Sequence, residues 1–522
     1  MSRRSFMGGA AILMIAGFFV RILGFVYRIY LSNLIGAEGM GIFQLVAPIY
    51  SLIILTVTSG ISIAVSRMVA AEQARNHLIN LRRITTMGIL GSAFGGLLFS
   101  IPMLAGLDFI VNTVLKDSRT YYSILFLIPA IPLISAASAL KGYFYGIQDV
   151  TPTAVSQIVE QIVKIGLVMA TAGFLVKAGL EYACAVATIG MAAGEISNFF
   201  VLLIIYKRRN TSNKFISRVG LLPKRNIVRE IFNITVPVSF NRFVTSVLNA
   251  VEQILIPRRL VAGGLSYHLS IEAFGRLSGM AMPLIFFPCL VTSSLATTLV
   301  PAISEAVSMK SFKTLNHRIG KSIQITFVLG FIFTAIFFSF SDEIGNLLYK
   351  NENIGPMLYG LSFACIFIYL QQTLLGVLNG LGKQVVSLRN SLMGSGIRIG
   401  FLYVFVPYYG VKGYFAGMFI SSFLVCILNL ITVVKTTGMV IDLGDWLIKP
   451  TLVCLVLIIT SKYVYSFFSI FHFSIALLTV ISVGTVCFEG IFLMAIFGVL
   501  DIKGTLKMVG IKFRQKSIYN KR

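Results

Sequence analysis

The chain has 522 residues, of which 57% are hydrophobic and only 12% are charged. Soluble proteins carry about 25% charged residues, so this composition excludes a disordered chain, a collagen-like repeat, a disulfide scaffold and an ordinary cytosolic enzyme. The formal net charge of +25 would suggest a nucleic-acid partner for a soluble protein. In so apolar a chain we expect instead a multi-pass membrane protein with basic cytoplasmic loops and no nucleic-acid partner.

Apolar segments long enough to cross a membrane recur from one end of the chain to the other. A helix that spans the hydrocarbon layer needs about 20 mostly apolar residues. The sequence therefore predicts an all-α membrane protein with about fourteen transmembrane helices, near residues 6–31, 41–65, 84–107, 120–140, 153–176, 182–206, 231–256, 273–299, 322–341, 357–380, 385–407, 413–434, 447–469 and 474–499.

The N-terminal segment carries an arginine pair, Arg3 and Arg4, before its first apolar stretch. A twin-arginine export signal has this appearance, but no small-residue cleavage site follows here. The stretch also contains Arg21 and Arg28, so we interpret it as the first membrane span.

Basic residues are distributed unequally between the two sets of predicted loops. With the N-terminus inside, cytoplasmic segments hold 30 of the 44 Lys and Arg residues, outer segments hold eight, and six lie within spans. Cytoplasmic loops of membrane proteins carry an excess of Lys and Arg. We therefore expect both termini in the cytoplasm of a bacterial cell.

An internal repeat relates the two halves of the chain. Residues 140–146 (LKGYFYG) align without gaps on residues 374–380 (LLGVLNG), and the same shift of 234 places Lys164 on Arg398. The matching segments are six spans apart, so the repeat is parallel, as in transporters that rock about a central cavity. We expect an N-lobe, a basic linker, a C-lobe, an extra helix pair and a basic tail, at 1–206, 207–230, 231–435, 446–499 and 500–522.

Two arginines share one face of the first span with two glycines. Gly17, Arg21, Gly24 and Arg28 follow each other at intervals of four, three and four residues, which places them on one side of a helix. A charge inside a membrane usually faces a cavity or a partner, and guanidinium groups suit phosphate. Arg21 and Arg28 are therefore predicted to bind substrate, although Arg28 could instead extend towards the membrane interface.

The seventh span carries a polar stripe formed by Arg242, Thr245, Asn249 and Glu252, with Asn241 beside it. On an otherwise apolar helix such a stripe predicts a wall that faces water. Arg242, Asn241 and Asn249 are candidate substrate-binding residues.

Four further residues place charge inside predicted spans. Arg276 lies near the outer end of the eighth span, where either substrate binding or an interfacial position fits. Glu160 and Lys164 are four residues apart with the acid first, an order that favours an ion pair, so they form either a structural pair or a proton relay. Arg398 has Gly394 where Glu160 would be and is the stronger ligand candidate.

The remaining acids are Glu195, Glu252 and Glu489, of which any one could couple to a cation or pair between helices. With Glu160 they leave the predicted interior at a net charge of +2, which favours an anionic substrate.

Motifs for catalysis and metal binding do not occur in this sequence. It contains no nucleotide-binding GxxxxGK[ST], no GxSxG and no HExxH motif. The six cysteines and four histidines are scattered without ligand-like spacing. We therefore expect no enzyme activity, no metal site and no cofactor, apart from a coupling cation or the membrane potential as a driving force.

The segment RILGFVYR at 21–28, followed by LIGAEG at 34–39 and GIF at 41–43, resembles the polysaccharide-transporter branch of the multidrug/oligosaccharidyl-lipid/polysaccharide (MOP) exporter superfamily. The resemblance implies two lobes, fourteen helices and a cavity that opens to one side at a time. It also implies transport of undecaprenyl-diphosphate-linked saccharides for cell-wall or spore-cortex peptidoglycan. By comparison with the lipid II flippases of this superfamily, Arg21, Arg28 and Arg276 would be the cavity arginines.

We therefore expect a lipid-linked oligosaccharide flippase of the bacterial cytoplasmic membrane. It would act as a monomer among membrane lipids, and wall-synthesis enzymes are candidate partners. Three alternatives stay open: an ion-coupled multidrug exporter of the same superfamily, a polytopic wall polymerase or ligase, and a scaffold for cortex synthesis that transports nothing.

Overall fold

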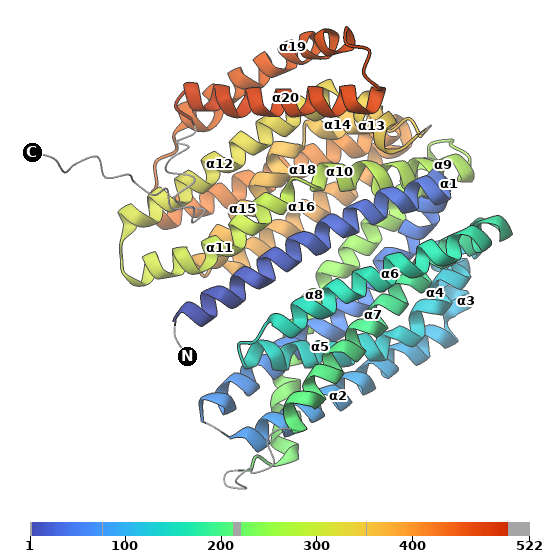
Figure 1. Ribbon diagram of the computed structural model, residues 1–522, viewed down its shortest axis with the longest axis vertical. Coiled ribbons are helices and arrows are strands. Elements are labelled where there is room, and N and C mark those ends of the chain that lie inside the picture. Colours follow the sequence, from blue (N-terminus) through green and yellow to red (C-terminus); the bar gives the residue numbers. More distant parts are fainter. Residues whose placement is uncertain (1–2, 76, 212–220, 351, 500–522) are drawn as a thin grey trace, which may run out of the picture. The chain divides into compact units, whose positions relative to one another are not determined.

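The computed structural model describes residues 3–75, 77–211, 221–350 and 352–499. Helices, joined by short turns, make up nearly all of these residues, and the described ranges contain no strand (Figure 1). Lipid cannot hydrogen-bond to an exposed backbone, so a helical chain satisfies its own backbone polar groups inside a membrane. The predicted all-α fold class is confirmed.

Contacts between residues divide the chain into two compact units. The first contains Met1–Pro283 and Arg398–Tyr414, and the second contains Leu284–Ile397 and Phe415–Arg522. These units follow packing rather than the sequence repeat, and the predicted boundaries at 206, 231 and 435 stay a prediction.

The first unit begins with α1 (Arg3–Ala74), which contains the first two predicted spans. Gly36 interrupts this helix with a φ of 68°, a left-handed conformation that glycine adopts at little cost. A straight helix over Ala16–Ala74 would be about 90 Å long, three times the hydrocarbon thickness of about 30 Å. The break at Gly36 therefore separates two spans.

The first unit contains further helical elements besides α1. They are α2 (Leu78–Ala105), α3 (Leu107–Phe109), the π-helix η1 (Ile110–Leu115), the 3₁₀ turn η2 (Ser118–Thr120), α4 (Tyr121–Leu127), the 3₁₀ turn η3 (Ile128–Ala130), α5 (Ile131–Gly146), α6 (Thr151–Ala178), α7 (Leu180–Thr211), α8 (Lys224–Ala262), α9 (Tyr267–Phe274), the π-helix η4 (Gly275–Ala281) and α17 (Val406–Tyr409).

The second unit is also helical throughout its described part. It contains α11 (Cys289–Ser308), α12 (Phe312–Ser339), α13 (Ser341–Leu348), α14 (Gly355–Ser362), α15 (Cys365–Gly380), most of α16 (Gln384–Val404) and of α18 (Val411–Thr437), η5 (Gly444–Ile448), α19 (Lys449–Ser469) and α20 (Ile475–Ile496). The short helix α10 (Met282–Phe286) begins at the end of the first unit and continues into the second.

The described residues form eleven helices that are long and apolar enough to cross a membrane, or twelve if the bent pair α14–α15 is one span. The predicted number of fourteen is not confirmed. One prediction was wrong in detail: 273–299 is not one continuous helix, because α10 ends at Phe286 and α11 begins at Cys289. Pro288 lies in this break, where its missing N–H and fixed φ disfavour a continuous helix.

In each repeat a glycine lets one helix pack closely against its neighbour, and the two glycines occupy equivalent positions. A methyl group on Gly142 of α5 would lie 2.6 Å from the carbonyl oxygen of Ser62 on α1. A methyl group on Gly376 of α15 would lie 2.7 Å from backbone atoms of Ala296 on α11. A shift of 234 residues carries Gly142 onto Gly376 and also carries Ser62 onto Ala296. The repeat found in the sequence therefore recurs as the same helix-to-helix contact in each half.

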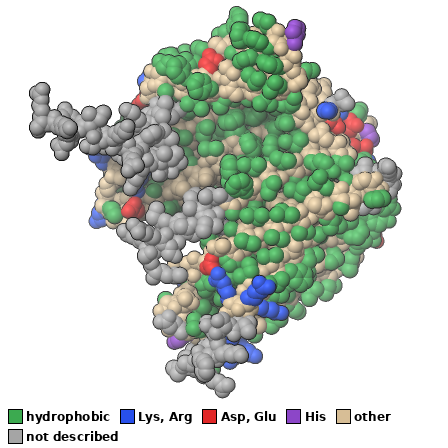
Figure 2. Space-filling model, viewed as in Figure 1, with side chains coloured by type: hydrophobic (Ala, Val, Ile, Leu, Met, Phe, Trp, Pro, Cys, Tyr) green, Lys and Arg blue, Asp and Glu red, His purple; other side chains and the backbone are tan. Residues whose placement is uncertain are grey.

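The exterior is strongly apolar. Figure 2 shows hydrophobic side chains over most of the visible face, with Lys and Arg side chains gathered at its margins. Large side chains such as Phe94, Phe174 and Phe488 are 68%, 82% and 71% exposed. Soluble proteins rarely expose large contiguous apolar patches, so this surface indicates contact with lipid.

Candidate functional site

The main charged cluster of the first unit lies on α6 and α7, and we name it the α6–α7 cluster: Glu160, Lys164, Glu195 and Asn198. Gly190 and Gly194 let the two helices approach closely, since a methyl group on Gly194 would lie 2.9 Å from the carbonyl oxygen of Glu160. Small residues four apart are a common device for close helix packing in membranes. They bring side chains of α6 and α7 together in an apolar setting.

In this cluster Glu160 and Lys164 pair with other residues and not with each other. Asn198 Nδ2 donates to Glu160 Oε2 at 2.7 Å, and Lys164 Nζ lies 4.9 Å from the centre of the Tyr27 ring. Glu160 and Lys164 attract each other electrostatically, but among the described residues no direct ion pair within 4.0 Å joins them. The ion pair that the four-residue spacing favours is therefore not formed here.

Glu195 extends the cluster towards α5 and α1. It interacts electrostatically with Glu160, Lys164 and Lys141, and the phenol of Tyr50 lies in the field of both carboxylates. One carboxylate oxygen of Glu195 is buried. Two acids and two bases thus share one region between helices, an arrangement that can hold or exchange a cation or a proton.

Sequence reasoning missed Tyr27, Tyr50, Lys141 and Asn198 as members of this region. Asn198 lies three residues after Glu195, so the helical spacing alone could have placed both on one face. Tyr27 precedes Arg28 directly, but its contact with Lys164 depends on the packing of α1 against α6, which no local pattern reveals.

Arg28 lies beside this cluster and contacts a π-helix. Its Nη2 donates to the carbonyl oxygen of Ser278 in η4 at 3.3 Å, and Gln44 Nε2 donates to the same oxygen at 2.8 Å. Arg28 also repels Lys164 electrostatically. Single π-helical turns occur often at functional sites, and this one presents a backbone acceptor to two side chains of α1.

The glycine face of α1 is open beside Arg21 and Arg28. A methyl group on Gly17 or Gly24 would meet no atom within 4 Å. Arg21 is exposed and Arg28 is half-buried. Two guanidinium groups therefore border a strip of helix surface with open space beside it, and substrate binding by Arg21 and Arg28 stays a prediction.

Arg398 forms an ion pair that the sequence did not predict. Its Nε donates to Glu252 Oε2 at 3.1 Å, with 21% and 7% of the two side chains exposed. Arg398 has no acid four residues before it, and its carboxylate comes instead from α8. This pairing weakens the prediction that Arg398 is a free ligand for substrate, because the acid already neutralises much of its charge.

The polar stripe on α8 is divided. Asn241, Arg242 and Asn249 are exposed, whereas Glu252 is buried against Arg398. Thr245 turns back to its own helix, where its hydroxyl donates to the carbonyl oxygen of Arg242 at 2.9 Å.

Arg276 belongs to a separate group of charged residues. Its Nη2 lies 3.4 Å from Glu272 Oε2. In the same group His268 Nε2 lies 2.8 Å from Glu38 Oε2, and Arg119 forms an ion pair of 2.5 Å with Glu38. The remaining members are Asp117 and Tyr267, whose hydroxyl donates to Asp117 Oδ2 at 3.0 Å. Burial and the carboxylate of Asp117 raise the pKa of Tyr267 above its usual value.

Within the described ranges, no group of three or more His, Cys, Asp or Glu side chains could hold a metal ion. A helical protein with an apolar exterior, repeated helix contacts and charges buried between helices has the features of a multi-pass membrane transporter.

Comparison with known families and proteins agrees with this class. The family model described as "Polysaccharide biosynthesis protein" matches residues 6–307, more than half of the chain. The chain therefore belongs to the polysaccharide biosynthesis protein family. A second family model, MatE, matches residues 277–404.

Two curated proteins of Bacillus subtilis (strain 168) are similar over most of their length. Stage V sporulation protein B is 29% identical over 451 residues, which cover 85% of this chain and 87% of that protein. Lipid II flippase MurJ is 26% identical over 416 residues, which cover 75% of each. Together with the fold, these relatives support a transporter of the MOP superfamily and confirm the resemblance found in the sequence.

Solved structures show the same fold. A multidrug resistance MATE family transporter of the MOP superfamily in an inward-facing conformation has a TM-score of 0.66 at 15% identity, covering 80% of this chain and 94% of that chain. A MOP superfamily transporter from Pyrococcus furiosus, described as having a binding pocket of reverse polarity, has a TM-score of 0.59 at 16% identity, covering 83% and 95%.

Proposed function

We propose that this protein is a flippase that moves an undecaprenyl-diphosphate-linked saccharide across the bacterial cytoplasmic membrane by alternating access. Its product would supply peptidoglycan synthesis in the cell wall or the spore cortex. Membership of the polysaccharide biosynthesis protein family and similarity to a lipid II flippase support this substrate class.

The observation that carries the proposal is the open glycine face of α1 with its two arginines. Gly17 and Gly24 leave space beside Arg21 and Arg28, and planar guanidinium groups bind phosphate oxygens in pairs. A diphosphate carries the charge that such a face attracts. In this proposal Arg242, exposed on α8, adds a further positive charge, while Arg398 and Arg276 act mainly through Glu252 and Glu272.

The α6–α7 cluster would couple transport to an ion. Glu160 and Glu195 repel each other, while Lys164 and Lys141 attract Glu195, so a proton or cation that enters would change the balance of charge. A ligand shifts a conformational equilibrium only by its differential affinity for the two states. Coupling therefore requires that one state hold the ion more tightly.

The proposal includes an orientation with both termini in the cytoplasm, taken from the excess of basic residues in alternate loops. It also includes a monomeric protein whose partners are its lipid-linked substrate and the surrounding lipids, with wall-synthesis enzymes as further candidates.

A vesicle assay tests the proposal. The purified protein is reconstituted, and access of a fluorescent wall-precursor lipid to a quencher outside the vesicle is followed over time. We expect wild-type protein to exchange the lipid between leaflets and the Arg21→Ala/Arg28→Ala variant to lose this activity at normal membrane abundance. The matched control is Lys313→Ala, which removes one exposed basic residue from α12.

Wild-type exchange by the double arginine variant would overturn the assignment of the site. Activity on cationic drugs in place of the precursor lipid, in the same vesicles, would favour the multidrug exporter. Absence of any transport by wild-type protein, with wall synthesis still dependent on it in cells, would favour a scaffold.

A further inference from the structure

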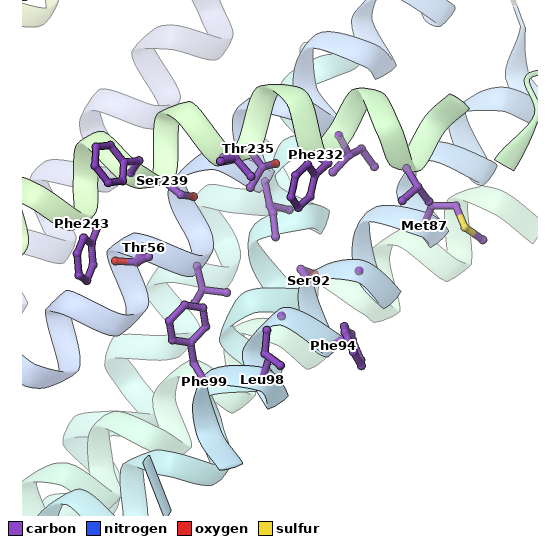
Figure 3. Close-up of a pocket in the computed structure, with 18 residues that line it drawn as sticks. Thr56, Met87, Ser92, Phe94, Leu98, Phe99, Phe232, Thr235, Ser239 and Phe243 are labelled. Carbon is purple, nitrogen blue, oxygen red and sulfur yellow. The ribbon is translucent and has the colours of Figure 1, made fainter. Parts of the chain in front are cut away.

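An apolar groove lies in the first unit, away from the charged clusters. It is bordered by the second half of α1, by α2 and by α8, and it has a volume of about 720 Å³. Figure 3 shows Phe94, Leu98 and Phe99 on one side and Phe232 and Phe243 on the other. Six of its residues are phenylalanines or leucines with large exposed areas, so the chain's own side chains leave the groove unfilled.

Glycine creates the space in this groove. Gly91 and Gly95 of α2 line it; a methyl group on Gly91 would meet nothing within 4 Å, and one on Gly95 would reach only Val57, at 4.0 Å. Gly60 of α1 does the reverse, since a methyl group there would lie 2.4 Å from the carbonyl oxygen of Thr235 on α8. Tight packing of α1 against α8 therefore fixes one wall of the groove, and the two glycines of α2, which have no side chains, keep the groove open.

One end of the groove is basic. A second cavity of about 480 Å³ is lined by Lys224, Arg225 and Arg229, and it shares Val228 and Phe232 with the groove. All three basic side chains are exposed at the start of α8. The only acid adjacent in sequence is Glu230, so this end keeps a positive charge.

Hydrogen bonds hold the basic end in place. Asn80 Oδ1 of α2 accepts from the backbone N–H of Leu222 at 3.1 Å, and Arg83 Nη1 donates to the carbonyl oxygen of Leu222 at 3.1 Å. Asn80 is itself fixed by Glu72, whose Oε2 accepts from Asn80 Nδ2 at 2.6 Å. The start of α8 is thereby tied to α2, and the two walls of the groove keep their spacing where the basic residues lie.

The length of the groove distinguishes between lipids. From Arg229 to Phe243 an α-helix rises about 21 Å, whereas one leaflet contributes only half of the hydrocarbon thickness of about 30 Å. An ordinary acyl chain whose headgroup sits at the basic end would stop before Phe243. A longer chain would fill the whole groove.

We propose that this groove binds the polyprenyl chain of a polyprenyl-diphosphate lipid, with the diphosphate held by Lys224, Arg225 and Arg229. The inference rests on the proposed function, because it takes the lipid carrier of that substrate as the ligand and places the basic end in the cytoplasmic leaflet. The groove would collect the lipid-linked saccharide from the leaflet in which it is made. The arginines of α1 would act at a later stage of transfer.

Binding can be measured without transport. The full-length protein is placed in nanodiscs of a neutral phosphatidylcholine, and the probe is undecaprenyl diphosphate with a photoreactive group near the end of its chain. We expect crosslinks on α2 and α8 near Phe99 and Phe243, and at least a tenfold weaker affinity in the Gly91→Leu/Gly95→Leu variant. Leucine at these positions fills the groove and favours the helix, so the variant keeps its fold.

Matched controls separate the groove from general effects. Gly173→Leu places the same side chain on an exposed face of α6 where a methyl group would meet nothing within 4 Å, and it is expected to bind the probe as the wild type does. The Arg225→Gln/Arg229→Gln variant is expected to bind the diphosphate probe more weakly than the wild type does. A polyprenol without phosphate should bind equally poorly to this variant and to the wild type. Lys313→Gln is the control for charge.

The outcomes separate this inference from the proposed function. Undiminished binding of the undecaprenyl diphosphate probe to the leucine variant would overturn the groove as a polyprenyl site. Equally strong competition by dioleoyl phosphatidylglycerol would also overturn it, and would show a general site for anionic lipids. If the leucine variant loses binding and the wild-type protein exchanges no precursor lipid, the groove is supported as a polyprenyl site and the flippase proposal is contradicted. Normal exchange and normal binding by the leucine variant would remove the groove alone.

Discussion

Lys164 on α6 and Arg398 on α16 occupy the same position in the two repeats, yet their surroundings differ. Lys164 shares its region with two carboxylates and a tyrosine ring, without a direct ion pair in the described structure. Arg398 is bound directly by Glu252 at 3.1 Å. One repeat thus has a charge cluster that can respond to an added ion, and the other has a closed ion pair. We infer that the repeats have divided the tasks of coupling and support.

The largest expected effect comes from removing the carboxylate of the ion pair between Arg398 and Glu252. Glu252→Gln leaves the guanidinium of Arg398 without its carboxylate in an apolar region, and such single removals cost about 3–5 kcal/mol in the free energy of unfolding. The thermal unfolding midpoint in detergent should fall strongly. Glu252→Gln/Arg398→Met should recover part of the loss, because no charge is then left behind.

If the single variant unfolds at the wild-type temperature, the pair does not support the fold and the contrast with Lys164 disappears. Glu160→Gln provides the matched comparison in the other repeat, with a smaller expected loss, because the amide oxygen of the new glutamine can still accept the hydrogen bond from Asn198.

Gly142 and Gly376 test whether the repeats are equivalent in packing while they differ in charge. A methyl group at either position would approach backbone atoms of the neighbouring helix to within 3 Å, and overpacking of this kind costs about 1–3 kcal/mol. Gly142→Ala and Gly376→Ala should therefore lower the thermal unfolding midpoint by similar amounts. Gly91→Ala, where space is open, should leave it unchanged or raise it. Unequal losses at the two equivalent glycines would break the structural equivalence.

Equivalent packing was predictable because the repeat is visible in the sequence, as the alignment of 140–146 on 374–380 shows. The fold class was also predictable, since apolar length and basic loops require little tertiary information. The partner of Arg398 was not, because Glu252 lies 146 residues away on a helix whose polar stripe indicated a water-facing role. Likewise, Tyr27 meets Lys164 only when α1 packs against α6, and Asn198 meets Glu160 only when α7 packs against α6.

The groove beside α2 also could not be predicted from the sequence. Gly91 and Gly95 are ordinary in a membrane helix, and their role depends on which neighbour they face. The 207–230 segment was expected to be a linker, but the part of it that the structure describes contributes Lys224, Arg225 and Arg229 to the end of a groove.

The next effect concerns transport rather than stability. Glu195→Gln removes one charge from the α6–α7 cluster, so the response to an ion gradient should fall about tenfold, equivalent to about 1.4 kcal/mol of coupling. Vesicles with an imposed proton or sodium gradient measure this directly, with exchange at zero gradient as the control. Equal losses with and without a gradient would show that Glu195 supports binding or folding and does not couple an ion.

The smallest expected effect lies in the group around Arg276, where His268 bridges Glu38 and Glu272 at 2.8 Å and 3.7 Å. Its side chain is 59% exposed, and exposed ion pairs contribute about 0–1 kcal/mol. His268→Gln should therefore barely change the unfolding midpoint, in contrast to Glu252→Gln. A loss as large as that of Glu252→Gln would mean that these charges hold the first unit together as firmly as the buried pair does, and that exposure is a poor guide to the strength of ion pairs in this protein.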